Sequence, residues 1–322
     1  MRVCIAGVGA VGATVAARLA ASSADVRLIA RGARLEDLRR NGLRVAFDGE
    51  ERLCARLPAS DRPSEFGIQD VLIVAVKAYS LPQLLPELAP LVGPQTAVAP
   101  LVNGIPWWYF QGNSGPGAGD AVHAVDPGAG LRDRFAAASI VGCVAYLTSR
   151  LAPDGWVIVS GTPRLHIRDI DGPAREHTRR LAALLSAAGI ATQVSERIRA
   201  ELWTKIALNA ATNPLSVISG ATLVEQFTDA RLLPIVRTVL EETGRVARAY
   251  GIAPAMALEE MLATGRRAGP FETSMLQDFR AGRPLELGAI GDALLELAAK
   301  IGEEMPTTRR LVGLCAYLGA RR

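Results

Sequence analysis

The first 196 residues alternate between short apolar runs and longer amphipathic stretches. Runs such as 71–76 are apolar at successive positions, which is typical of strands buried on both faces of a parallel sheet. Stretches such as 81–91 place apolar residues at helical spacing instead. The expected strands, in chain order, are 2–6, 26–29, 43–47, 51–55, 70–76, 96–102, 138–147, 155–159, 164–167 and 192–195. Strands that alternate with helices in this way predict an α/β, Rossmann-type doubly wound parallel sheet.

From about Arg197 the spacing of apolar residues changes to the helical period. The expected helices are 197–211, 230–250, 254–265, 286–302 and 306–319. The pattern therefore predicts an α/β domain over residues 1–196, followed by an all-helical domain over residues 197–322. Residues 111–130 are rich in Gly, Pro, Asp and Ser, and we expect an irregular loop there.

Composition narrows the class of protein. The chain has 322 residues, a net charge of +4 and four scattered cysteines without a CxxC pair. This argues against a zinc site or a disulfide framework and favours a reducing cytoplasm. Arginine pairs are spread over predicted helix faces, so we expect no nucleic-acid partner. No apolar run reaches the roughly 18–20 residues that span a bilayer, so we expect no membrane partner.

A glycine-rich turn follows the first predicted strand. Gly7, Gly9 and Gly12 have the spacing G-x-G-x-x-G, and a predicted helix begins directly after them. In dinucleotide-binding folds these glycines allow a tight turn, admit the pyrophosphate and let the helix pack closely on the strand. The residues expected to bind the cofactor here are Gly7, Val8, Gly9, Ala10, Val11 and Gly12.

The second predicted strand ends just before a basic residue. NAD enzymes usually place Asp or Glu there to bind the ribose hydroxyls, whereas this chain has Arg31, with Arg34 three residues on. A guanidinium suits a 2′-phosphate, so Arg31 predicts NADP (NADPH) as the cofactor. The alternative is that Arg31 is a solvated loop charge.

Two polar residues end later strands. Lys77 follows the run at 71–76, and Asn103 follows the strand at 96–102. Ligands in doubly wound sheets lie outside the carboxyl ends of the strands, so we expect both residues at the cofactor. A strand-ending Lys or Asn can also be incidental.

The predicted helix at 197–211 and its extension carry a polar stripe. Lys205, Asn209 and Asn213 are spaced four residues apart among apolar neighbours, so they share one helical face. Asparagine is a poor helix former, and a lysine held in such surroundings can protonate a reacting carbonyl. The alternative is a solvated polar face. Farther along, Ser274 and Glu286 are candidates for the same site, although Glu286 is also explained as an acid at a helix N-terminus.

These motifs together resemble the ketopantoate reductase (2-dehydropantoate 2-reductase) family over nearly the whole chain. The matching features are the glycine turn, Arg31, the Val-Lys-Ala around Lys77, the Asn-Gly at Asn103, the Trp-Thr-Lys at Lys205, and the Ser-Met-Leu-Gln-Asp that begins at Ser274. The resemblance implies an oxidoreductase that reduces 2-dehydropantoate to pantoate in pantothenate biosynthesis. Hydride would pass from NADPH to the 2-oxo carbon, with Lys205 as the general acid.

The resemblance also implies roles for the remaining residues. Glu286 would contact the cofactor ribose and organise the site. Asn209, Asn213 and Ser274 would hold the hydroxyl and carboxylate of the substrate. Asn103 would bridge cofactor and substrate, and Lys77 would lie by the nicotinamide ribose.

The chain departs from the family pattern at three places, one of which is the segment before Ser274, which lacks the Asn often found there. Members of the family carry an additional substrate-side Asn where this chain has Leu223, and the loop after Asn103 contains Trp107 and Trp108 within an unusual aromatic run at 105–110. The aromatic run either reshapes the pocket or packs the loop onto the second domain. Three hypotheses follow: a true ketopantoate reductase, a reductase of another branched or bulky 2-oxo acid, and a non-catalytic NADP(H)-binding protein. The apolar stripes of the helices suit a homodimer, but also suit packing within one chain.

Overall fold

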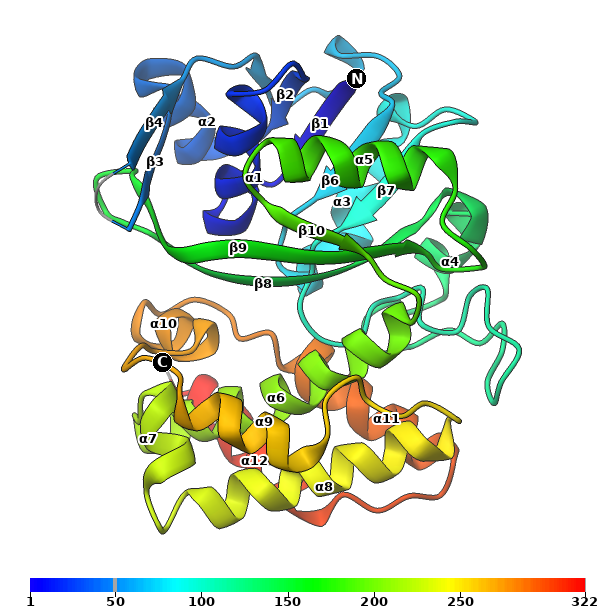
Figure 1. Ribbon diagram of the computed structural model, residues 1–322, viewed down its shortest axis with the longest axis vertical. Coiled ribbons are helices and arrows are strands. Elements are labelled where there is room, and N and C mark those ends of the chain that lie inside the picture. The colour runs from blue at the N-terminus through cyan, green and yellow to red at the C-terminus, as the bar shows by residue number, and fades with distance from the viewer. Residues whose placement is uncertain (49–50, 322) are drawn as a thin grey trace. The chain divides into compact units, whose positions relative to one another are not determined.

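The computed structural model describes residues 1–48 and 51–321, and these fold into two compact units (Figure 1). Unit 1 comprises Met1–Val102 and Asp133–Ile198, and unit 2 comprises Asn103–Arg132 and Arg199–Arg322. The expected boundary after residue 196 lies close to the change of unit at Ile198. The expectation of two contiguous domains differs from the structure, because the segment Asn103–Arg132 belongs to unit 2. Its aromatic side chains are buried there, as described below.

Unit 1 contains a parallel sheet with the strand order β5-β2-β1-β6-β7. Its strands are β1 (Arg2–Ala6), β2 (Asp25–Ile29), β5 (Ala59–Ser60), β6 (Val71–Val74) and β7 (Ala97–Pro100). Helices α1 (Ala10–Ala20), α2 (Gly32–Asn41) and α3 (Leu81–Glu87) connect them. Ala6 pairs with Ile29 on one side and with Val74 on the other, so the carboxyl ends of β1, β2 and β6 lie level. The predicted doubly wound sheet is confirmed.

A second sheet of unit 1 has the order β10-β9-β3-β4, with β8 also paired to β9. Its elements are β3 (Leu43–Phe47), β4 (Glu51–Ala55), β8 (Val141–Leu151), β9 (Val157–Asp169) and β10 (Ala191–Val194), with helices α4 (Gly130–Arg134) and α5 (Glu176–Ala187) nearby in the chain. The strands expected at 155–159 and 164–167 form one strand, because β3 pairs with its first part and β10 with its second. The hairpin expected around Asp48-Gly49 corresponds to the antiparallel pair β3 and β4, although Gly49 lies outside the described residues.

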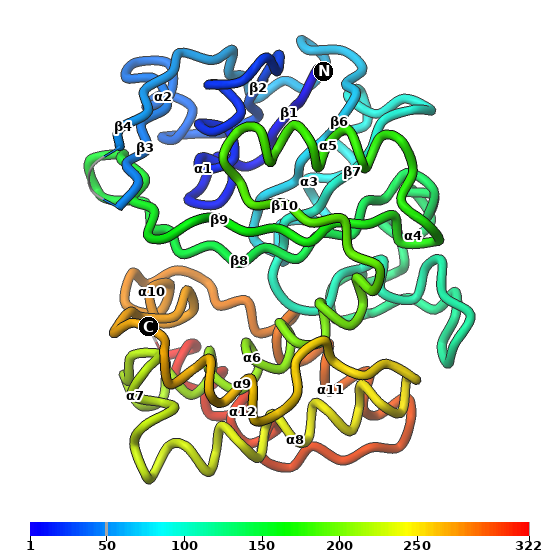
Figure 2. The backbone as a smooth tube through the Cα atoms, viewed as in Figure 1, coloured from blue at the N-terminus to red at the C-terminus, as the bar shows by residue number. Residues whose placement is uncertain are grey.

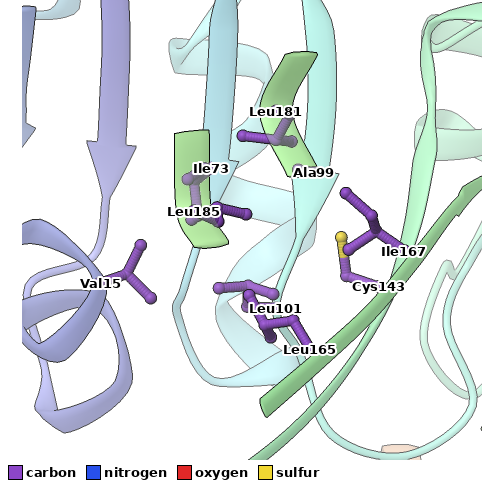
Figure 3. Close-up of a pocket in the computed structure, with 9 residues that line it drawn as sticks. All are labelled: Val15, Ile73, Ala99, Leu101, Cys143, Leu165, Ile167, Leu181 and Leu185. Atoms are coloured by element: carbon purple, nitrogen blue, oxygen red, sulfur yellow. The ribbon is translucent and has the colours of Figure 1, made fainter. Parts of the chain in front are cut away.

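The layers of unit 1 leave a small internal cavity (Figure 3). Its volume is about 10 Å³, close to the minimum for a single water, and its walls offer no polar surface. The side chains that point into it come from α1, from both sheets and from α5; they are Val15, Ile73, Ala99, Leu101, Cys143, Leu165, Ile167, Leu181 and Leu185. This cavity is a packing gap in the core and is too small for a substrate.

Unit 2 is helical, and its course is traced in Figure 2. Its helices are α6 (Ile198–Ser219), α7 (Leu223–Thr228), α8 (Leu233–Ala249), α9 (Leu258–Arg266), α10 (Ser274–Arg280), the π-helical turn η5 (Gly288–Asp292), α11 (Ala293–Lys300) and α12 (Pro306–Gly319). The sequence pattern did not predict α7 and α10, because helices this short complete too few turns to show a period. Helix α6 continues past its expected end at 211 and contains Pro214. None of the helices in the described part of the chain is both long and apolar enough to cross a membrane.

Candidate active site

The glycine turn of unit 1 connects β1 to α1, and each glycine has a different surrounding. Gly7 has a φ of +93°, and a Cβ there would lie 2.6 Å from the carbonyl oxygen of Ala75. A Cβ on Gly12 would lie 1.9 Å from the carbonyl oxygen of Gly7. A Cβ on Gly9 would meet no atom within 4 Å. Gly7 and Gly12 are therefore required by packing, whereas Gly9 leaves the turn open to an approaching ligand.

The N-terminus of α1 offers an anion site at this open position. Gly9 is the N-cap residue, no side chain caps the helix, and its first turn carries no acidic residue. The amide groups and dipole at a helix N-terminus attract phosphate. The exposed, side-chain-free face at Gly9 therefore fits the diphosphate of a dinucleotide, with Val8, Ala10 and Val11 completing the turn.

The two arginines after β2, Arg31 and Arg34, differ in their partners and in their exposure. The Arg34 Nε donates to the carbonyl oxygen of Val8 at 2.9 Å, and its Nη1 donates to Asp37 at 2.6 Å. Burial lowers the pKa of Arg34. Arg31 instead has an exposed side chain that forms an ion pair with Glu87. Arg34 thus holds the glycine turn in place, and Arg31 is the arginine that a ligand can reach.

Lys77 directly extends the carboxyl end of the parallel sheet. It is partly exposed and lies three residues after β6, which pairs with β1. Its carbonyl oxygen accepts a hydrogen bond from the amide of Ser80 at 2.9 Å. Because β1, β2 and β6 end level, unit 1 brings the glycine turn, Arg31 and Lys77 to one edge of the sheet.

Asn103 begins the segment of the chain that belongs to unit 2. The next residue, Gly104, has a φ of +82°, and a Cβ there would lie 2.2 Å from the carbonyl oxygen of Ala289. The amide of Ile105 donates to the same oxygen at 2.8 Å. Ala289 lies in the π-helical turn that follows Glu286, so this packing ties the Asn103 turn to the Glu286 segment. Such turns are frequent at functional sites.

The aromatic run after Asn103 forms part of the core of unit 2. The side chains of Trp107, Trp108, Tyr109 and Phe110 are each at most 1% exposed. The indole Nε1 of Trp203 on α6 donates to the Tyr109 hydroxyl at 3.0 Å, and the Tyr109 ring also contacts Phe110. Of the two interpretations of this run, the structure supports packing against the helices.

Lys205 and Glu286 interact within unit 2. Lys205 is partly buried on α6, and Glu286 is only 5% exposed. Burial lowers the pKa of Lys205 to about 8, while the carboxylate of Glu286 opposes that shift. An ammonium group with a pKa close to the working pH can both hold and release a proton, which suits general acid catalysis. The structure thus brings together the two residues that the sequence selected as catalytic candidates.

The remaining candidates lie where α6 meets the start of α10. Asn213 is 4% exposed; its Nδ2 donates to the Asn209 carbonyl oxygen at 3.2 Å, and its Oδ1 accepts from the Met275 amide at 3.4 Å. Asn213 therefore links the helices through its own amide group. Asn209 is half-buried, and Ser274 is exposed at the first position of α10.

Sequence reasoning missed two features of this region. Thr273 caps α10 by accepting from the Leu276 amide at 3.2 Å, and its hydroxyl lies 2.6 Å from that of Ser216 on α6. The second feature lies in the composition: of 36 lysines and arginines only three are lysines, namely Lys77, Lys205 and Lys300. Two of these three lysines, Lys77 and Lys205, are candidate site residues, so the scarcity of lysine is a signal that could have singled them out.

Comparison with known proteins identifies the family. The family model described as "Ketopantoate reductase PanE/ApbA" matches residues 3–107, and that described as "Ketopantoate reductase PanE/ApbA C terminal" matches residues 197–318. A protein of Mesorhizobium japonicum named 2-dehydropantoate 2-reductase is 34% identical, over 100% of this chain and 99% of its own.

Solved structures agree with this assignment. The crystal structure of a candidate ketopantoate reductase from Ralstonia solanacearum MolK2 superimposes with a TM-score of 0.93 at 34% identity, covering 100% of this chain and 98% of that one. A D-mandelate dehydrogenase solved with NADH and anilino(oxo)acetate shares the fold, with a TM-score of 0.86 at 23% identity over 100% and 99% of the two chains. The chain therefore belongs to the ketopantoate reductase (PanE/ApbA) family.

Proposed function

We propose that this protein reduces 2-dehydropantoate to pantoate with NADPH, as a cytoplasmic enzyme of pantothenate biosynthesis. The observation that carries the proposal is the buried Lys205 of the helical unit, where burial lowers the lysine pKa to about 8 and the charge of Glu286 opposes that shift. Reduction of a ketone needs a proton donor at the carbonyl oxygen, and an ammonium with this pKa supplies one near neutral pH. Names of relatives at up to 34% identity support the same substrate.

Each residue has a role in this proposal. A bound nicotinamide supplies the hydride to the 2-oxo carbon. Lys205 protonates the ketone oxygen and stabilises the negative charge that develops there, and Glu286 keeps the lysine cationic while binding the cofactor ribose. Asn209, Asn213 and Ser274 hold the hydroxyl and carboxylate of the substrate; because both polar groups of the Asn213 amide also bond within the protein, its contribution is chiefly to position its neighbours.

The remaining polar residues serve the cofactor. Asn103 contacts both cofactor and substrate, and Lys77 contacts the nicotinamide ribose. Arg31 pairs with the 2′-phosphate and so makes NADPH the preferred cofactor, which its exposure supports. Replacing Arg31 by Ala is expected to weaken NADPH binding far more than NADH binding, and equal weakening would remove this part of the proposal.

A second candidate is a reductase of a bulkier or more apolar 2-oxo acid. Leu223 stands at the start of α7, where its amide donates to the carbonyl oxygen of Phe271 at 2.9 Å. The Phe271 side chain is 38% exposed. These two residues offer an apolar surface instead of an amide group. The fold also serves the D-mandelate dehydrogenase solved with anilino(oxo)acetate, an aryl 2-oxo compound.

The test is a substrate panel followed through the absorbance of the reduced nicotinamide, with NADPH and NADH in parallel. The panel contains ketopantoate, 2-oxoisovalerate, which lacks the hydroxymethyl group, and phenylglyoxylate. The highest kcat/KM for ketopantoate with NADPH supports the proposal, whereas a higher value for either analogue supports the second candidate. A Leu223→Asn variant should then shift preference towards ketopantoate. NADPH binding without turnover of any panel member would identify a non-catalytic binding protein.

A further inference from the structure

An ion pair crosses the nucleotide edge of unit 1. Arg31 follows β2, and Glu87 is the last residue of α3, which follows β6. Strands β2 and β6 lie on either side of β1, and β1 leads into the glycine turn. The pair therefore connects the two segments that flank this turn, where doubly wound sheets bind the adenosine half of a dinucleotide.

Both partners of this pair are open to solvent. The side chains of Arg31 and Glu87 are 51% and 50% exposed. Exposed ion pairs are weak and readily exchanged, because water screens the charges and both side chains lose freedom. The neighbouring Arg34 does not offer the same exchange, because it is held by the Val8 carbonyl oxygen and by Asp37. Arg31 is thus the guanidinium that can change its partner, and Glu87 is the partner it would leave.

We propose that Glu87 is a specificity-determining residue that competes with the 2′-phosphate of the cofactor for Arg31. This inference rests on the proposed NADPH preference. A phosphate dianion offers the guanidinium more charge and more acceptor oxygens than a carboxylate, so it displaces Glu87 when NADPH binds. The 2′-hydroxyl of NADH cannot displace it. The carboxylate therefore reduces the difference in affinity between NADPH and NADH. Only NADPH has to break the ion pair and place its phosphate near a second anion.

The test measures binding of cofactor fragments by calorimetry, independently of turnover. The probes are adenosine 2′,5′-bisphosphate and adenosine 5′-monophosphate, titrated into the wild type and the Glu87→Gln variant. Glu87→Gln keeps the shape of the side chain and removes its charge. The bisphosphate should bind about two- to fivefold more tightly, matching the worth of an exposed ion pair, and the monophosphate should bind unchanged. Glu65→Gln is the matched control, because Glu65 pairs with Arg62 elsewhere on unit 1.

An Arg31→Ala variant separates this inference from the proposed function. If Arg31→Ala weakens only the bisphosphate, and Glu87→Gln tightens its binding when Arg31 is present but not once Arg31 is removed, the competition is established. If Arg31→Ala weakens only the bisphosphate but Glu87→Gln leaves it unchanged or weaker, the competition is wrong and the NADPH preference stands. If Arg31→Ala weakens both probes equally, the NADPH preference is wrong, and the role of Glu87 with it.

Discussion

The candidate sites of the two units are made from different parts of the chain: backbone in unit 1 and side chains in unit 2. In unit 1 the glycine turn is made of backbone, and the absence of side chains at Gly7, Gly9 and Gly12 shapes it. In unit 2 the candidate catalytic groups are side chains, above all Lys205 on α6 and Glu286 just before η5. The first kind of site is broken by adding a methyl group, whereas the second is broken by changing a charge at constant shape. The predictions below test this difference.

The largest effect is expected for Lys205→Met, which keeps the length of the side chain and removes the ammonium. Turnover should fall by roughly 10²–10⁴-fold, the usual contribution of a positioned proton donor, while NADPH binding stays nearly unchanged. Steady-state kinetics and calorimetric titration measure the two quantities. Lys300→Met is the control, because Lys300 pairs with Asp120 near the end of α11 and should not affect turnover. An equal loss of binding and turnover in Lys205→Met would make the lysine a cofactor or structural residue.

A change of glycine to alanine in the glycine turn should lower stability at one position and dinucleotide affinity at another. In Gly12→Ala the added carbon would lie 1.9 Å from the Gly7 carbonyl oxygen, so overpacking should lower the free energy of unfolding by about 3 kcal/mol. In Gly9→Ala the added carbon meets no protein atom within 4 Å, so stability should change little while dinucleotide affinity falls. Denaturant unfolding and NADPH titration on both variants decide this. Equal destabilisation of the two variants would refute the separate roles of the glycines.

The pH dependence of reduction should report the environment of Lys205. The protonated lysine is the active form and its pKa is about 8, so kcat/KM should fall as the pH rises through about 8. Glu286 raises this pKa, so in Glu286→Gln the fall should begin at a lower pH, whatever the loss in maximum rate. A pH profile whose descending limb stays in place in this variant would show that the carboxylate does not act on the lysine.

The smallest effect is expected at the aromatic run of unit 2. Tyr109→Phe removes the acceptor of the Trp203 indole N–H and leaves a buried donor without that partner. The free energy of unfolding should fall by about 1–3 kcal/mol, with kcat/KM changed less than twofold. Tryptophan fluorescence during denaturant unfolding measures the first quantity. A large change in substrate preference at unchanged stability would instead indicate that the aromatic run lines the substrate pocket.

Local motifs were predictable from the sequence, and contacts between distant residues were not. The glycine turn and the stripe that carries Lys205 depend on spacing within one strand–helix unit or one helix, so the pattern was sufficient. The placement of Asn103 in unit 2 depends instead on the burial of the following aromatic residues against Trp203, which is far away in the chain. Hydrophobicity shows that such residues are buried, but it does not show which core receives them.

The same limit applies to the nucleotide edge. The sequence indicated Arg31 and predicted its cofactor, but the pairing with Glu87, 56 residues away, is not encoded in any local pattern. The bonds that hold Arg34, to the Val8 carbonyl oxygen and to Asp37, were likewise not predictable from the sequence. The second sheet was missed for a related reason, since it depends on the pairing of β9 with β8, β3 and β10, which come from distant parts of the chain.

The excursion of Asn103–Arg132 into unit 2 has a consequence for how the chain is made. A ribosome releases Trp107, Trp108, Tyr109 and Phe110 well before Trp203 on α6 and Tyr250 just after α8, the two rings against which Tyr109 packs. Until unit 2 has been synthesised, this aromatic segment has no core to pack into, even when all of unit 1 is present. Because synthesis runs from the N-terminus, the segment can bind a chaperone or misfold until the last third of the chain has emerged.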